Sequence, residues 1–200
     1  CSPVTTVYTG AAQALCATTV TGVGGLNLTP APVYTNHTNV GTATASYSYA
    51  GDANHDVSDD SATFAITKAS STTTVTCAPL TTVYTGAAQE LCATTVTGVG
   101  GLSLTPAPVY TDHTNVGTAT ASYSYAGDAN HDISDDSATF AITKATSTTT
   151  VTCAPVTTVY TGAAQALCAA TVTGVGGLSL TPTPVYTNHT NVGTATASYA

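Results

Sequence analysis

Cationic side chains are almost absent from this sequence. Lys68 and Lys144 are its only lysines, arginine does not occur, and the formal net charge is -8. A protein that binds nucleic acid needs a basic surface to displace the counterions of the phosphates. The sequence therefore excludes nucleic acid as a partner, and it disfavours anionic membrane surfaces for the same reason.

Large and helix-favouring side chains are also scarce. Trp and Met are missing, Phe occurs only twice, and Glu90 is the only glutamate. No apolar run approaches the roughly 18 residues that a membrane-spanning helix needs, so we expect no membrane insertion in this segment. The abundant residues are instead Thr, Val, Ala and Tyr, and Thr, Val and Tyr suit a pleated, half-buried surface. The composition predicts an all-β chain.

The sequence repeats with a period of 76 residues. The string that begins Cys-x-Pro-x-Thr-Thr-Val-Tyr-Thr-Gly at Cys1 returns at Cys77 and at Cys153. We call residues 1–76 the first copy, 77–152 the second copy and 153–200 the third copy. The first two differ at few positions; Glu90 replaces Ala14 and Asp112 replaces Asn36, and we expect both new carboxylates on the surface.

Short strands and turn residues alternate within one copy. Gly117–Tyr125 places alanine and tyrosine on one face and hydroxyls on the other, and Ser137–Lys144 repeats this pattern with Phe140 and Ile142. Such alternation is typical of half-buried strands, and we expect these two to pair as a hairpin around an acidic loop. About seven short strands per copy and no helix predict a β-sandwich. Further strands are expected at 72–77, 82–85, 91–97 and 109–111.

Several motifs of the copy resemble a known family. Tyr-Thr-Gly-x-Ala-x-x-x-Cys, Thr-Asn-x-Gly-Thr-Ala-Thr-Ala, Tyr-Ala-Gly-Asp-Ala-Asn-His and Phe-Ala-Ile-Thr-Lys-Ala together cover Tyr84 to Ala145. They are similar to the tandem bacterial immunoglobulin-like repeats (Big/MBG type) of large secreted and surface proteins. The resemblance implies an all-β fold of tandem immunoglobulin-like β-sandwich repeats of 76 residues. It also implies an extracellular or cell-surface location.

The repeat boundaries differ from the cysteine positions, because a strand precedes Cys77 and Cys153. We predict an immunoglobulin-like repeat at 1–68 that lacks its first strand. A complete repeat follows at 69–144. The segment 145–200 is predicted to be a repeat without its C-terminal strands.

Six cysteines occur as one pair per copy, with 15 positions between the two members. Metal sites usually show CxxC spacing or added histidines, so we favour structural disulfides. Closing such a loop contributes about 3 kcal/mol in the chain-entropy model, and a regular series of disulfides implies an oxidising compartment. An alternative pairs Cys16 with Cys77 across copies. The predicted disulfide residues are Cys1, Cys16, Cys77, Cys92, Cys153 and Cys168.

The carboxylates of each copy concentrate in one loop. Clustered oxygen ligands suit Ca²⁺, although the spacing does not fit an EF-hand. The competing interpretation is a solvated turn whose charge discourages edge-to-edge aggregation. The candidate calcium ligands are Asp52, Asp56, Asp59 and Asp60 in the first copy and Asp128, Asp132, Asp135 and Asp136 in the second. No other cofactor is expected.

The sequence does not predict an enzyme. His55, Asp56 and Ser58 have the residue types of a hydrolytic triad, but adjacent residues on one loop cannot adopt its geometry. Lys68 and Lys144 each stand at the end of a predicted repeat, and we favour an exposed lysine at this position. The alternative is a covalent cross-link from the lysine to an asparagine.

The sequence favours a structural role. We expect the repeats to stack on neighbouring repeats of the same protein, as a stalk, fibre or surface filament, with self-assembly as a further expectation. The alternative is an adhesin module for glycans or surfaces, with Tyr8, Tyr34 and their equivalents in the other copies lining a shallow site.

Overall fold

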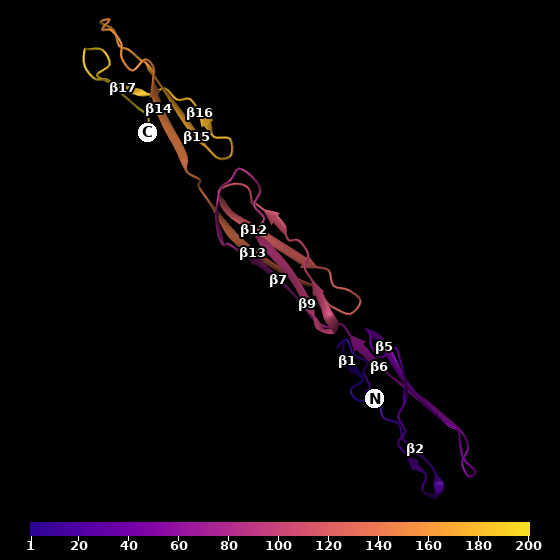
Figure 1. Ribbon diagram of the computed structural model, residues 1–200. Helices are drawn as coiled ribbons and strands as arrows, with labels where there is room; N and C mark the ends of the chain where they lie inside the picture. Colours follow the sequence, from indigo (N-terminus) through magenta and orange to yellow (C-terminus); the bar gives the residue numbers. More distant parts are fainter. The chain divides into compact units, whose positions relative to one another are not determined.

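The computed structural model describes all residues from Cys1 to Ala200 and is all-β, which confirms the predicted class. It contains strands β1 to β18 and two 3-10 turns, η1 and η2 (Figure 1). Up to residue 77 the elements are β1 (Thr5–Val7), β2 (Val20–Thr21), η1 (Val23–Gly25), β3 (Asn27–Leu28), β4 (Val33–Thr35), β5 (Gly41–Tyr49), β6 (Ser58–Thr67) and β7 (Ser71–Cys77).

The remaining elements follow the same order at the 76-residue sequence spacing, except that residues 157–159 form no strand and residues 175–177 no 3-10 turn. They are β8 (Thr81–Val83), β9 (Cys92–Gly98), η2 (Val99–Gly101), β10 (Leu102–Leu104), β11 (Val109–Thr111), β12 (Gly117–Tyr125), β13 (Ser134–Thr143), β14 (Ser147–Cys153), β15 (Cys168–Gly174), β16 (Ser179–Leu180), β17 (Val185–Thr187) and β18 (Thr196–Ser198).

The chain divides into two compact units, and each is described by itself. Unit 1 comprises Cys1–Thr76, Cys92–Val109 and Ala121–Ala138, and unit 2 comprises Cys77–Leu91, Tyr110–Thr120 and Thr139–Ala200. Unit 1 thus contains residues of the first and second copies, and the whole third copy lies in unit 2. The domains 1–68, 69–144 and 145–200, which follow the sequence period, stay predictions.

The largest sheet of unit 1 has the strand order β1-β6-β5-β4. β5 and β6 pair antiparallel from Gly41↔Ile66 to Tyr49↔Ser58, which confirms the predicted hairpin around the acidic loop. β1 lies on the other side of β6 and runs parallel to it. The strand order recurs as β11-β12-β13-β8 in the second copy. In unit 2, β14 and β15 pair antiparallel and lie side by side in Figure 1.

The core of unit 1 is small and is built around β6. Phe64 and Ile66 are each 2% exposed, and they pack with Ala43, Tyr8 and other apolar residues. Alanine on β5 faces the large side chains on β6, because Ala43 is opposite Phe64 in the register. Leu15, Tyr34, Val40, Cys1 and Cys16 cover this cluster. Full burial of one phenylalanine stabilises the folded state by about 1.5–3 kcal/mol.

One tight turn explains a difference between the copies. Asn36, Asp112 and Asn188 occupy equivalent positions and have φ angles of 54°, 55° and 55°. Among residues with a side chain, Asn and Asp tolerate this left-handed conformation best. The turn therefore accepts the change from Asn36 to Asp112. Asp112 and Glu90 are both exposed, as predicted.

No helix of the structure has the length and apolar character needed to span a membrane.

Candidate inter-repeat interface at the acidic loop

Disulfides join the beginning of a copy to the strand that follows. Cys1 is bonded to Cys16 and Cys153 to Cys168, and the second pair faces each other in the β14–β15 register. Cys77 and Cys92 are also disulfide-bonded, and no cysteine is free. The Cys1–Cys16 bond excludes the alternative between Cys16 and Cys77. Three disulfides indicate an oxidising environment, such as that of exported proteins.

The acidic loop of the first copy is organised by the carboxylate of Asp52. It accepts hydrogen bonds from the backbone N–H groups of Asn54 (2.8 Å) and His55 (2.9 Å), from the Tyr49 hydroxyl (2.9 Å) and from His55 Nδ1 (2.8 Å). These donors, the Asn54 N–H first, lower the pKa of Asp52 to about 2. The loop is thus a turn that the aspartate closes by accepting bonds from the chain that follows it.

His55 connects this loop to η1. Its Nε2 lies 3.0 Å from the Val23 carbonyl oxygen, and its Nδ1 lies beside the Asp52 carboxylate. Both ring nitrogens therefore face acceptors, which the doubly protonated ring satisfies. The Val23 carbonyl and then the carboxylate raise the pKa of His55 above 6.5.

The second copy repeats this loop but buries it more deeply. Asp128 accepts bonds from Asn130 N, His131 N, His131 Nδ1 and the Tyr125 hydroxyl at 2.7–2.9 Å. His131 Nε2 lies 2.9 Å from the Val99 carbonyl oxygen. The side chain of His131 is only 5% exposed, whereas that of His55 is 20% exposed. Residues of the first copy account for this difference, because they cover the loop of the second.

Two side chains of the first copy contact the loop directly. The ring of Tyr8 meets the ring of His131 edge-on, with 5.4 Å between the centroids and an interplanar angle of 86°. Lys68 Nζ donates to the Asp128 carbonyl oxygen at 2.6 Å and to the His131 carbonyl oxygen at 3.4 Å. The lysine is exposed, as predicted, and its ammonium binds carbonyl groups at the end of the second copy's loop.

Backbone groups complete the contact. Ala69 N donates to the Asn130 carbonyl (2.9 Å), and Asp132 N donates to the Ala69 carbonyl (2.8 Å), which forms a bridge between Ala69 and His131. The Asn130 side chain accepts a bond from Val40 N at 3.0 Å. We call this contact the His131 junction; it consists of Tyr8, Val40, Lys68 and Ala69 with Asp128, Asn130, His131 and Asp132.

Glycine allows a second close approach beside the junction. Gly100 in η2 lies against the hydroxyl and ring of Tyr8, and Gly10 lies against the backbone of Gly100. A Cβ atom on Gly100 would collide with the tyrosine ring. Within unit 2, Gly176 lies in the same way against Tyr84, and Gly86 against Gly176. The tyrosine–glycine contact thus recurs at the sequence period.

The remaining carboxylates of the acidic loops do not converge. Asp59 and Asp60 are consecutive on β6 and point to opposite faces, as Asp135 and Asp136 do on β13. Asp60 accepts a bond from Ser61 N, and Asp136 from Val75 N at 2.8 Å. No group of three or more His, Cys, Asp or Glu residues could hold a metal ion. Asp56 and Asp132 join no such group either, and we therefore propose no calcium site.

Of the two tyrosines that the sequence offers for a shallow binding site, Tyr8 is buried and Tyr34 is half-buried beside a cavity of about 490 Å³. Tyr8 is 8% exposed and belongs to the core and the junction. The Tyr34 hydroxyl accepts a bond from Cys16 N (2.9 Å) and donates to the Cys16 carbonyl (2.8 Å). Neither forms an exposed aromatic platform.

Sequence reasoning did not find the His131 junction. The signal was a loop in which Tyr, Asp, Asn and His recur together, but their partners across the junction are 60 to 123 residues away. No family model, curated protein or solved structure matches this chain.

Proposed function

We propose that the chain is a non-enzymatic, extracellular structural protein. Its copies form immunoglobulin-like repeats that stack on neighbouring repeats of the same protein to make a stalk, fibre or surface filament. The observation that supports this proposal best is the His131 junction. It combines a backbone bridge, a lysine bound to two carbonyl groups and a buried histidine, all between residues of adjacent sequence copies.

The junction groups also recur along the sequence. Tyr8 has counterparts at 84 and 160, Gly100 has counterparts at 24 and 176, and Lys68 has a counterpart at 144. A contact made from repeated residues can be made again at each step of an array. Nearest-neighbour contacts then add stability along it, as in other repeat proteins.

The disulfides support an exported protein. The buried cluster of Phe64 and Ile66 with Tyr8, Ala43 and Ala69 is a small core for a repeat of this length, and small exported domains compensate with disulfides. The near absence of cationic side chains gives a surface without affinity for nucleic acid.

Electron microscopy and small-angle X-ray scattering of the 200-residue chain test the proposal. We expect thin rods of one dominant length for the wild type. The variant Lys68→Ala should give bent particles and a broader distribution of end-to-end distances, because the ammonium no longer binds the Asp128 and His131 carbonyls.

Lys144→Ala is the matched control. This exposed lysine has the equivalent position in the second copy, and the third copy within this sequence ends before the equivalent of Asp128. It should leave the particles unchanged. Compact wild-type particles without a preferred long axis, or equal effects of the two variants, would contradict the proposal.

A further inference from the structure

A polar cavity lies at the turn that joins β4 to β5 in the first copy. Its volume is about 490 Å³, which is within the range of about 300–1,000 Å³ that is typical of small-molecule sites. The polar part of its wall consists of Asn36, His37, Thr38, Asn39 and Thr42. No carboxylate, ammonium or guanidinium group lines the cavity. The site therefore has the size and the neutrality that suit a small uncharged ligand.

The fold leaves most of the polar groups in this wall unused. The side chains of Asn36, Thr38 and Thr42 make no hydrogen bond within the chain. His37 Nδ1 is buried and has no partner either, whereas most buried polar atoms in proteins have one. The left-handed backbone of Asn36, with φ at 54°, places this residue at an exposed position of the turn. The wall thus has more hydrogen-bonding capacity than the chain itself uses.

Contacts with distant residues hold the turn in place. The side-chain amide of Asn130 accepts a bond from Val40 N at 3.0 Å and donates to Asn39 Oδ1 at 3.3 Å. The carbonyl oxygen of His37 accepts a bond from Gln13 N at 2.8 Å. The amide group of Asn39 therefore keeps its own donors for a ligand. A site that is fixed in advance loses less conformational entropy when a ligand binds.

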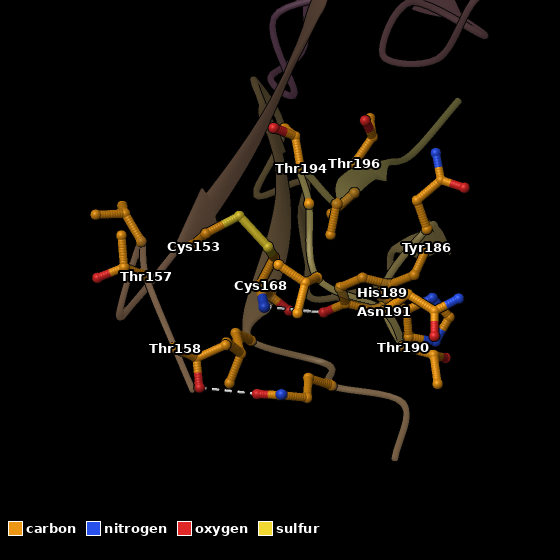
Figure 2. Close-up of a pocket in the computed structure, with 18 of the residues that line it drawn as sticks. Cys153, Thr157, Thr158, Cys168, Tyr186, His189, Thr190, Asn191, Thr194 and Thr196 are labelled. Carbon is orange, nitrogen blue, oxygen red and sulfur yellow. Dashed lines mark hydrogen bonds between the residues drawn. A yellow bond between two sulfur atoms is a disulfide. The ribbon is translucent and has the colours of Figure 1, made fainter. Parts of the chain in front are cut away.

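The same wall recurs in the other two copies. The cavity of the second copy has a volume of about 400 Å³ and is lined by Asp112, His113, Thr114, Asn115 and Thr118. Figure 2 shows the turn of the third copy, in which the side chains of Tyr186, His189, Thr190 and Asn191 lie close together. In each copy the rings of the tyrosine and the histidine pack with 5.2–5.3 Å between their centroids. The ring pair, the amide and the hydroxyl groups are thus repeated at the sequence period.

We propose that this turn is a binding site for neutral saccharides in each copy. Sugar hydroxyls both donate and accept hydrogen bonds, and so do threonine hydroxyls and asparagine amides. Tyr34 and Val40 supply apolar surface in the same wall for the C–H groups of a sugar ring. The site does not depend on the proposed stacking of repeats.

Charged ligands do not suit this wall. Carboxylate and phosphate groups are bound most strongly by cationic side chains, and none lines the cavity of the first copy. The net charge of -8 also repels anions. Ca²⁺ prefers clustered carboxylates and carbonyl groups, and the chain has no group of three or more His, Cys, Asp or Glu residues for a metal ion.

The test is an NMR titration of the isotope-labelled, full 200-residue chain. The neutral probes are maltose, cellobiose, lactose and diacetylchitobiose, and digalacturonate is the acidic probe. At least one neutral disaccharide should shift the amide signals of residues 36–42 and of their equivalents in the other copies, in a saturable manner. Digalacturonate should leave these signals unchanged.

A hydroxyl-free variant tests the role of the wall. Thr38→Val, Thr114→Val and Thr190→Val, made together, keep the shape of the side chain and remove one hydroxyl group from each site. The loss of one hydrogen bond should weaken saccharide binding about three- to ten-fold. The matched control is Thr63→Val with Thr139→Val, because both threonines are exposed on β6 and β13 outside the cavities. This control should bind as the wild type does.

Three results would overturn the proposal. They are the absence of saturable shifts with every neutral disaccharide, equal binding of digalacturonate, and undiminished binding to the hydroxyl-free variant. Unchanged amide signals outside the turn show that each variant is folded. The stacking of repeats is tested separately by the Lys68→Ala variant, so the failure of one proposal is distinguishable from the failure of the other.

Discussion

At the scale of single residues, conformation and protonation each depend on a few contacts. Asp112 has a left-handed backbone with φ at 55°, where side chains branched at Cβ are strained. We predict that Asp112→Val lowers the free energy of unfolding by about 1–2 kcal/mol, whereas Asp112→Asn is neutral. Urea titrations measure both. Thr111→Val on the neighbouring exposed strand position controls for the added apolar surface, and an equal loss there would contradict the explanation.

His131 is predicted to make stability depend on pH. Burial lowers the pKa of its ring, but the Val99 carbonyl and the Asp128 carboxylate outweigh burial and nearby Lys68, so the pKa lies above 6.5. A raised pKa contributes stability that is fully present below about pH 6.5 and is lost as the pH rises through the folded-state value. We expect the stability difference between wild type and His131→Gln to be larger at pH 5.5 than at pH 8.5.

At acidic pH, the dependence of stability on pH comes from the aspartates. Asp52 has a pKa of about 2 in the folded state and 3.8 as its ordinary value, so its contribution to stability is present above pH 3.8 and is lost as the pH falls through 2.

His113→Gln is a control for the His131→Gln variant, since the ring of His113 contacts Tyr110 and lies outside the junction. A pH dependence of the same size in both histidine variants would contradict the role of His131.

At the scale of elements, β6 supplies Phe64 and Ile66, the large aliphatic and aromatic side chains at the centre of the buried cluster in the first copy. We predict that Phe64→Ala lowers the free energy of unfolding by about 3–5 kcal/mol, because it leaves a cavity that the alanines of β5 cannot fill. Chemical denaturation followed by tyrosine fluorescence measures the change. Val57→Ala, at a 73% exposed position next to the same strand, should cost little, and a comparable loss there would show that the loop and not the core is responsible.

The sequence predicted the strands with clear alternation and also the short strands at 82–85 and 109–111, which correspond to β8 and β11. Ala119, Ala121 and Tyr125 are buried on one face of β12, as expected, and the hairpin partner carries Phe140 and Ile142. The parallel pairing of β1 with β6 was not predicted. Three residues, Thr5–Val7, have no periodicity of their own, and the partner lies about 60 residues away. Pairing at that distance depends on the closed core and not on local preference.

The candidate sites were also predicted only in part from the sequence. Cysteine spacing favoured a bond such as Cys1–Cys16 but left the pairing of Cys16 with Cys77 open, and the structure decides between them. The acidic loop was located only in part, because Asp59, Asp60, Asp135 and Asp136, which were expected in it, lie on β6 and β13. The function of Asp128 as a turn-closing acceptor follows from its backbone bonds to Asn130 and His131. Counting carboxylates cannot reveal which ones already have partners.

At the scale of the whole molecule, the contact between copies depends on glycine at one position. Gly100 and Gly101 both have positive φ angles, 67° and 86°, so alanine is strained at either. Only at Gly100 would the new methyl group also collide with Tyr8; at Gly101 it meets nothing within contact distance. We predict that Gly100→Ala opens the His131 junction and that Gly101→Ala, which strains the backbone without this collision, does not.

Hydrogen exchange of the Ala69 and Asp132 amides, which donate across the junction, measures this opening. Their protection should fall at least ten-fold in Gly100→Ala and should stay near the wild-type value in Gly101→Ala. Equal loss in both variants would mean that backbone strain, and not the tyrosine contact, is responsible.

The binding of Lys68 has a consequence for proteolysis. Trypsin can cleave this chain only after its two lysines, because arginine is absent. The Lys68 ammonium is held by carbonyl groups, and the residue after it, Ala69, is 4% exposed and bonded on both sides of its backbone. Lys144 is exposed in an irregular segment. Limited digestion should therefore cut after Lys144 first and release 1–144 as a resistant fragment, detected by mass spectrometry; initial cleavage after Lys68 would contradict this order.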